Sequence, residues 1–190
     1  ETGAGRMAEP ADILEAAAAC FAPGVLAGRT VLITAGPTQE AIDPVRFITN
    51  RSSGKMGFAV AAAAREAGAR VVLVAGPAAI PPPAGCEVVR ATSAGEMFDA
   101  VMARVAEADI FIGTAAVADY TIAAPAGRKM KKQGSELVLT LVPTKDILAH
   151  VAAHPARPYT VGFAAETDNL EAYARGKLAA KSLDLIAANL

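Results

Sequence analysis

The sequence predicts one α/β domain in which helices cover both faces of a mainly parallel sheet. Short apolar runs rich in Val, Ile and Leu, typical of buried strands, alternate with helical patterns from Thr30 onward. The length of 190 residues is that of a single domain, and 53% hydrophobic residues suffice for a sizeable core. We therefore expect a three-layer, Rossmann-like fold whose ligands bind at the carboxyl ends of the strands.

The first half of the pattern has clear element boundaries. Thr30–Ala35 is β-branched and apolar and predicts the first strand, and the polar segment 36–53 after it predicts a loop. An Ala-rich helix is expected over 54–67, with Gly68 at its C-terminal end. Val71–Ala75 predicts a second buried strand.

The second half continues the alternation. Ser93 and Glu96 predict a capping box at the start of a helix that runs to about residue 108. A basic segment with Gly and Pro, 123–134, predicts a loop. Further strands are expected at 87–90, 109–114, 136–142, 159–164 and 184–188, and further helices at 145–153 and 170–181. The candidate binding loops are 36–53, 76–83, 113–134 and 164–168.

The first residues differ from the rest of the chain. Residues 1–10 are Gly-rich and irregular, and Asp12–Phe21 predicts a short Ala-rich helix. We interpret residues 1–28 as a leader or linker and residues 29–190 as the domain.

Composition argues against several classes of protein. The net charge of −1, from 18 basic and 19 acidic residues, gives no broad basic field for nucleic acid or an anionic membrane. No apolar run approaches the ~20 residues of a membrane span, and the N-terminus lacks a signal-peptide pattern. Cys20 and Cys86 form neither a disulfide framework nor a metal-binding spacing. We expect a cytoplasmic protein without nucleic-acid or membrane partners.

One loop has the pattern of an anion site. Asn50–Gly57 leads into a helix N-terminus and supplies backbone N–H groups, the hydroxyls of Ser52 and Ser53, and Gly54. The alternative is that a serine only caps the helix. An ordinary NAD site is not expected, because Gly3–Ala8 matches the dinucleotide pattern without a strand before it.

Other segments have both a binding and a packing interpretation. The small residues of 114–118 at a strand end leave room for a planar ring beside Asp119, or pack tightly under a helix. The lysines of 129–132 form either a mobile phosphate-binding flap or a solvated surface. Lys177 and Lys181 share a helix face through their four-residue spacing.

Six strings, in order along residues 28–189, resemble phosphopantothenoylcysteine synthetase, and in particular the C-terminal half of the bacterial bifunctional synthetase/decarboxylase. They are Ile33–Glu40, Ile42–Arg46, Asn50–Gly57, Ala115–Tyr120, Lys129–Lys132 and Gly162–Thr167. The leader resembles the tail of the decarboxylase half. The rest of that half is absent, so no flavin is expected.

The resemblance implies a ligase of coenzyme A biosynthesis. It implies that 4′-phosphopantothenate is joined to L-cysteine with CTP and Mg²⁺ through an acyl-cytidylate, in a homodimer. It assigns no protein ligands to the metal. Because relatives continue beyond Asn189, a catalytically incomplete nucleotide-binding or dimerisation domain of the same family is the alternative.

The resemblance also implies roles for single residues. Asn50 would hold the acyl-cytidylate carbonyl, Lys129 would contact the α-phosphate, and the substrate phosphate would be bound by Ser52, Ser53 and Gly54. At Lys145 many relatives carry Asn-Pro before the Asp, whereas Thr144-Lys145 precede Asp146 here. The implied CTP contacts are Gly113, Thr114, Ala115, Asp119, Lys129, Lys145, Asp146, Ile147, Leu148, Phe163, Lys177 and Lys181.

Overall fold

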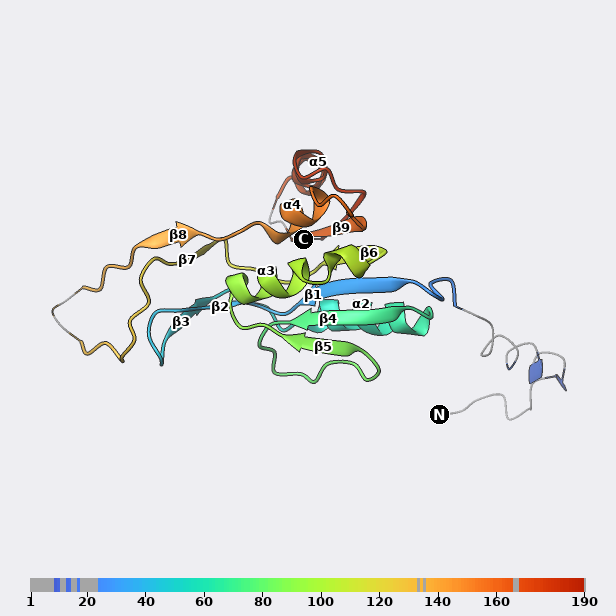
Figure 1. Cartoon of the computed structure of the whole chain (residues 1–190), viewed down its shortest axis with the longest axis horizontal. Helices are drawn as coiled ribbons and strands as arrows, with labels where there is room; N and C mark the ends of the chain where they lie inside the picture. The colour runs from blue at the N-terminus through green and yellow to red at the C-terminus, as the bar shows by residue number, and fades with distance from the viewer. Residues whose placement is uncertain are drawn as a thin grey trace.

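A parallel sheet forms the centre of the molecule. The computed structural model describes residues 9–10, 13–14, 17, 24–132, 134, 136–165 and 168–189. Within them, six strands pair in parallel (Figure 1). In spatial order they are β10 (Leu185–Asn189), β9 (Tyr159–Ala165), β6 (Ile110–Gly113), β1 (Thr30–Ala35), β4 (Arg70–Ala75) and β5 (Glu87–Arg90). The predicted fold class is confirmed.

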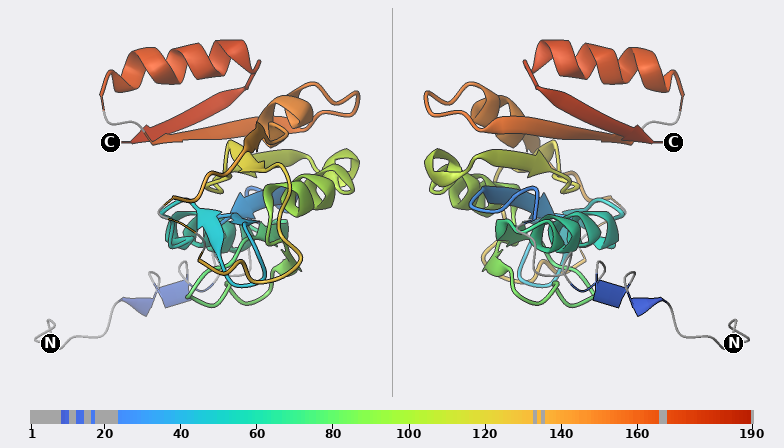
Figure 2. Two further views of the ribbon diagram at one scale, coloured as in Figure 1. Left: turned by 90° about the vertical axis from the view of Figure 1, so that its left-hand side faces the viewer. Right: turned by 90° about the vertical axis from the view of Figure 1, so that its right-hand side faces the viewer.

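Helices pack against both faces of this sheet because its central strands are apolar on both sides. Alternate residues of β1 point to opposite faces, so Val31 and Ile33 pack with helix α2 (Lys55–Glu66) while Leu32 packs on the other side. That other side is covered by α3 (Ala94–Met102) and α4 (Ile147–Ala152). Helix α5 (Leu170–Ala180) lies against β10 and β9, at one edge of the sheet (Figure 2).

Two short antiparallel pairs project from the carboxyl-end side of the sheet (Figure 1). One joins β2 (Gln39–Ala41) to β3 (Phe47–Thr49), where the sequence predicts only a loop. The other joins β7 (Tyr120–Ile122) to β8 (Leu141–Pro143). We call the segment between β7 and β8 the flap.

The expected strand at 136–142 is wrong over most of its length, because ladder pairing reaches only its last two residues. Beyond the β7–β8 ladder, one bond from the Ala123 N–H to the Thr140 carbonyl closes the pair, and residues 136–140 are not part of a strand. Alternating hydropathy over 136–142 does not supply the pairing partner that a strand requires.

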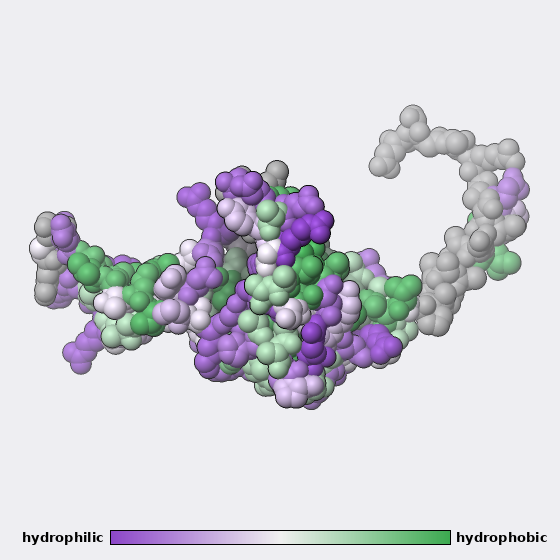
Figure 3. Space-filling model, turned by 90° about the horizontal axis from the view of Figure 1, so that it is seen from above, coloured by the Kyte–Doolittle hydropathy of each residue, from purple (hydrophilic) through white to green (hydrophobic). Residues whose placement is uncertain are grey.

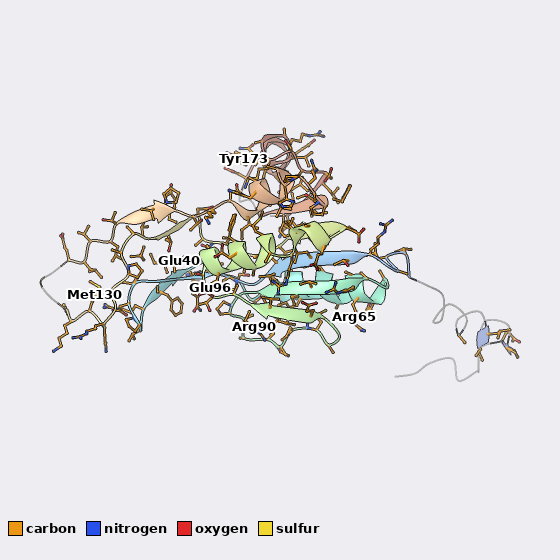
Figure 4. All side chains as sticks on the ribbon, in the orientation of Figure 1. Glu40, Arg65, Arg90, Glu96, Met130 and Tyr173 are labelled. Carbon is orange, nitrogen blue, oxygen red and sulfur yellow. The ribbon has the colours of Figure 1, made fainter. Side chains whose placement is uncertain are left out.

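The helix boundaries differ in detail from those predicted. The helix expected to reach residue 108 ends at Met102, and a 3₁₀ turn, η1 (Val105–Glu107), follows it. Ser93 does cap α3 by accepting the Glu96 N–H at 3.1 Å, but the Glu96 carboxylate accepts from Thr92 (2.7 Å) rather than from Ser93. Figure 4 shows Glu40 beside this cap, where its carboxylate accepts the Ala94 N–H at 2.9 Å.

The expected leader lies largely outside the described residues, as does most of the helix expected over Asp12–Phe21. In the part of the chain that the structure describes, no helix is both long enough and apolar enough to cross a membrane.

Gly57 allows helix α2 to lie directly on the strand ends. A Cβ at this position would stand 2.5 Å from the Ala35 Cβ and would also clash with the Thr114 hydroxyl. The Gly57→Ala substitution should therefore lower the free energy of unfolding by about 1–3 kcal/mol, as overpacking does.

Gly176→Ala is the matched control for this prediction. A Cβ there meets nothing within 4 Å, so relief from the glycine entropy cost should stabilise α5 by about 0.5–1 kcal/mol. Urea denaturation of both variants checks the pair. Equal effects would contradict the close contact at Gly57.

Candidate functional site

A cavity of about 360 Å³ opens where β6 and β9 end. Its walls come from these strand ends, from the segment after β6, from the start of α4 and from α5. It is lined by Thr34, Phe111, Gly113, Ala115, Val117, Ala118, Asp119, Thr144, Lys145, Asp146, Ile147, Leu148, Phe163, Lys177 and Lys181. The carboxyl end of a parallel sheet is where α/β folds bind ligands.

Two glycines in register keep the strand ends flat and close to α4. Gly113 of β6 pairs with Gly162 of β9. A Cβ on Gly113 would stand 3.4 Å from Leu148, and a Cβ on Gly162 would stand 2.7 Å from Leu183 and 3.1 Å from Leu148. Of the two, Gly113 lines the cavity, and together with Ala115 and Ala118 it gives the cavity a floor of small side chains, which suits a planar ring.

Three lysines stand around the cavity, and each has a defined contact. On α5, Lys177 donates to the Phe163 carbonyl at 2.8 Å and Lys181 pairs with the Asp146 carboxylate at 2.7 Å. The third, Lys145, lies with its Nζ 4.4 Å from the centre of the Phe98 ring, a cation–π contact. Each contact fixes the position of one of three lysines that line the cavity.

Asp146 combines two structural tasks. Its second oxygen accepts the Ala149 N–H at 3.0 Å and so caps α4. Burial raises the pKa of this carboxyl, but the hydrogen bonds from Lys181 and Ala149 outweigh burial and hold the pKa below its usual value. Asp146 therefore stays ionised and holds Lys181 in place.

The segment after β1 runs beside the segment after β6 and extends their parallel pairing. Pro37 bridges to Ala116, and the Ala116 N–H donates to the Gly36 carbonyl at 2.9 Å. The buried Thr38 hydroxyl accepts the Ala118 N–H at 3.0 Å. One wall of the cavity is therefore fixed to the loop that leads toward Asn50.

The Asn50 side chain lies against the same wall. Its Nδ2 donates to the Val117 carbonyl at 3.0 Å and to the Ala116 carbonyl at 3.4 Å. Asn50 does not line the cavity, but its side chain bonds the backbone of Val117, which does.

Ser52 and Ser53 organise the start of α2. The Ser52 and Ser53 hydroxyls accept the N–H groups of Gly54 (3.3 Å) and Lys55 (3.4 Å). Gly54 takes the left-handed conformation, with φ at 76°, and a Cβ at this position would stand 3.4 Å from the Gly36 Cα. A twelve-residue helix thus begins next to Asn50, and the partial positive charge of its N-terminus favours an anion there.

Comparisons with known proteins show the family to which this chain belongs. The family model described as "DNA/pantothenate metabolism flavoprotein C-terminal domain" matches residues 26–190. The chain belongs to this family. It is 52% identical over 192 residues to the coenzyme A biosynthesis bifunctional protein CoaBC of Vibrio parahaemolyticus, and 53% identical over 194 residues to that of Escherichia coli K12. In each case all of this chain matches 48% of the relative, so the chain spans about half the length of these relatives.

Solved structures show the same fold for this family. The C-terminal domain of CoaBC superposes with a TM-score of 0.77 at 45% identity, covering 86% of this chain and 78% of that one. The DNA/pantothenate metabolism flavoprotein of Streptococcus pneumoniae gives 0.75 at 26% identity, covering 85% and 82%. A mutant Cab2 in complex with phosphopantothenate-cysteine gives 0.71 at 17% identity, covering 94% and 75%, which shows a shared fold only.

Most of the CTP contacts implied by the resemblance are brought together in this family's fold. Two are not. Thr114 does not line the cavity, and its hydroxyl donates to the Thr34 carbonyl at 2.6 Å. Lys129 is carried by the flap, whose residue Met130 stands at the far end of the projecting arm in Figure 4. The other ten residues line one cavity, and the CTP contacts of all twelve stay predictions.

Some cavity residues were not singled out from the sequence. Thr34 and Phe111 lie inside apolar strands and carry no local signal of binding. Thr144 donates from its hydroxyl to the Ala118 carbonyl at 2.6 Å, and both residues line the cavity. The Phe98 ring under Lys145 depends on the packing of α3 against α4, which no short sequence pattern reveals.

Metal binding has few donors here. Among the described residues, no group of three or more His, Cys, Asp or Glu side chains lies together. The carboxylates that line the cavity are Asp119 and Asp146, and Asp146 is bonded to Lys181.

Proposed function

We propose that this chain is a ligase domain of coenzyme A biosynthesis that joins 4′-phosphopantothenate to L-cysteine with CTP, through an acyl-cytidylate. The observation that carries the proposal is the cavity with its small-residue floor and three oriented lysines, attached to the Asn50 loop. Support comes from relatives named as coenzyme A biosynthesis proteins and from the fold shared with a protein solved with phosphopantothenate-cysteine.

The nucleotide occupies the cavity in this proposal. The cytosine ring lies over Gly113 and Ala115 beside Phe163, and Asp119 accepts from the ribose or the base. The triphosphate lies toward the lysines of the cavity, Lys145, Lys177 and Lys181. Phosphate oxygens are favoured there because charge-assisted hydrogen bonds to ammonium groups are stronger than neutral ones.

The second substrate binds on the other side of the shared wall. Its phosphate takes the N-terminus of α2, with Ser52, Ser53 and Gly54, and its carboxylate reaches past Asn50 toward the nucleotide. The 3.4 Å bond from Asn50 to the Ala116 carbonyl is long and weak, so this N–H is the one most readily exchanged for a substrate carbonyl.

The reaction then has two substitutions. The substrate carboxylate oxygen attacks the α-phosphorus of CTP, one P–O bond forms, and pyrophosphate leaves with the electrons of the broken P–O bond. The cysteine amine next attacks the acyl carbon, a C–N bond forms, the C–O bond to phosphate breaks, CMP leaves, and the amine nitrogen releases one proton to solvent. The cavity lysines neutralise charge in the first step, and the Asn50 N–H groups stabilise the developing oxyanion in the second.

Mg²⁺ is part of the proposal as a partner of CTP. Mg²⁺ is usually bound by substrate phosphates together with one or two carboxylates, and in this proposal the phosphates of CTP hold it. When bound, the ion would offset the negative charge of the triphosphate.

A pyrophosphate-release assay tests the proposed function. With 4′-phosphopantothenate and Mg²⁺, CTP should support release and ATP should support much less, and added cysteine should yield the amide. Nucleotide binding without pyrophosphate release would favour the alternative, a catalytically incomplete binding or dimerisation domain. Equal turnover with ATP would contradict the CTP assignment.

We propose a homodimer as the working form. The arm formed by the two antiparallel pairs exposes large apolar side chains, among them Phe47, Tyr120 and Leu141, and Figure 3 shows this apolar surface along the arm. An exposed apolar surface of this kind marks an interface, so we expect the arm to pack against a second copy. The flap, whose residue Met130 lies at the far end of the arm, would then close over a cleft shared by the two copies. Light scattering at micromolar concentration should give twice the mass of the chain; the mass of a single chain would contradict the dimer.

Lys129→Gln should reduce turnover far more than Lys132→Gln. Only Lys129 is assigned to the α-phosphate, and loss of one charge-assisted contact to the transferring group should cost about 2–4 kcal/mol, roughly 30- to 1000-fold in kcat. Steady-state kinetics with CTP measure both variants. Comparable losses would mean that the flap acts only as diffuse positive charge.

Asn50→Asp should slow amide formation more than cytidylate formation. The substitution keeps the size of the side chain but replaces its N–H donors with an anion, which repels the oxyanion that forms when cysteine attacks. Acyl-cytidylate should therefore accumulate on the variant, and rapid quench with mass spectrometry detects it. An intermediate that reacts with cysteine at the wild-type rate would remove this role from Asn50.

A further inference from the structure

A buried carboxylate in the turn between β2 and β3 holds the flap. The Asp43 side chain is fully buried although the turn, residues 42–46, projects from the body of the protein. One carboxylate oxygen accepts the N–H groups of Val45 and Arg46, both at 2.9 Å. The other accepts from the Arg46 Nε and Nη2 at 3.0 and 2.6 Å and from the Met130 N–H at 3.0 Å.

The Met130 residue is bonded on both of its polar backbone groups. Its N–H donates to Asp43, and its carbonyl accepts from the Arg46 Nη2 at 2.9 Å. A third bond, from the Ala126 N–H to the Ile42 carbonyl at 2.9 Å, holds the flap four residues earlier. Lys129 lies between these two attachment points.

These three bonds matter because few other hydrogen bonds hold the described part of the flap. The β7–β8 ladder ends at Ile122, and one more bond joins Ala123 to Thr140. Among the described flap residues, the hydrogen bonds that reach the rest of the protein all end on the 42–46 turn.

We propose that Asp43 is a positioning residue for the ligase reaction, which through Met130 sets the place of Lys129. This inference rests on the proposed function. Asp43 itself is buried and does not line the cavity; it acts through the flap backbone.

The ionised form of Asp43 maintains the hydrogen bond from the Met130 N–H at neutral pH. The hydrogen bonds from Arg46 lower the pKa of this carboxyl most, burial raises it, and the N–H groups of Met130 and Val45 lower it further. The net pKa lies well below its usual value, so the carboxylate stays ionised at neutral pH and keeps accepting from Met130.

Asp43→Asn tests the proposal, because it keeps the shape of the side chain but replaces one accepting oxygen with an NH₂ group. In the wild-type background we expect turnover to fall by roughly 10- to 100-fold, and in the Lys129→Gln background by less than about 3-fold. Residues that act through one another show such non-additive effects, whereas a general loss of structure would slow both backgrounds by the same factor and overturn the proposal.

Asp109→Asn is the matched control. Asp109 also accepts from an arginine and a backbone N–H, Arg29 at 2.9 Å and Thr30 at 2.8 Å, but at the amino end of the sheet. It should leave turnover within about 3-fold of wild type, as expected for a site far from the flap. A loss equal to that of Asp43→Asn would overturn the proposal.

Limited trypsin digestion gives a readout independent of activity. The flap carries Arg128, Lys129, Lys131 and Lys132, so release of its backbone should speed cleavage there in Asp43→Asn and not in Asp109→Asn. Unchanged cleavage would overturn the proposal. If wild type releases no pyrophosphate, the proposed function fails while this digestion still tests the attachment.

Arg46→Lys serves if Asp43→Asn does not fold. A lysine keeps the charge beside Asp43 but lacks the planar fork that bonds the carboxylate and the Met130 carbonyl together. We expect faster cleavage in the flap and a loss of turnover that again depends on Lys129. Wild-type values in both measurements would overturn the proposal.

Discussion

The continued pairing of the chain beyond β1 and β6 is the constraint on which the site depends. Beyond the strand ends, residues 36–38 and 116–118 remain bonded through Gly36, Thr38, Ala116 and Ala118. The cavity therefore shares a wall with the Asn50 loop and the N-terminus of α2. An enzyme that joins two anions needs such an arrangement, because each anion must have its own cationic or N–H partners while their reacting atoms meet.

Orientation of charge is built into the cavity before a ligand arrives. Lys177 and Lys181 are held by the Phe163 carbonyl and by Asp146, and Lys145 rests on the Phe98 ring. Groups that are already placed lose less conformational entropy on binding. In the flap, by contrast, Asp43 and Arg46 bond the backbone of Met130 and not a lysine side chain. The flap lysines therefore keep their ammonium groups for the ligand.

Sequence patterns predicted the elements that are decided by local composition. Thr30–Ala35 and Glu87–Arg90 were predicted with the observed boundaries, because both contain adjacent β-branched residues, which favour strands. Only the first of them is largely buried, whereas Glu87–Arg90 is the edge strand β5. The three-residue strands β2, β3 and β7 were missed, since so short a segment has no measurable periodicity. The resemblance supplied most of the residues that line the cavity, but Thr34 and Phe111 are apolar-strand residues that only tertiary structure identifies. The position of Lys129 depends on Asp43, which bonds to Met130 across 87 residues and leaves no local pattern.

A crystal structure with CTP and Mg²⁺ would show directly whether the cavity beyond β6 and β9 is the nucleotide site. We expect the cytosine ring over Gly113 and Ala115, the triphosphate in contact with Lys177 and Lys181, and the N-terminus of α2 left for the second substrate. A nucleotide bound with its phosphates on Ser52 and Ser53 instead, or outside this cavity, would contradict this expectation.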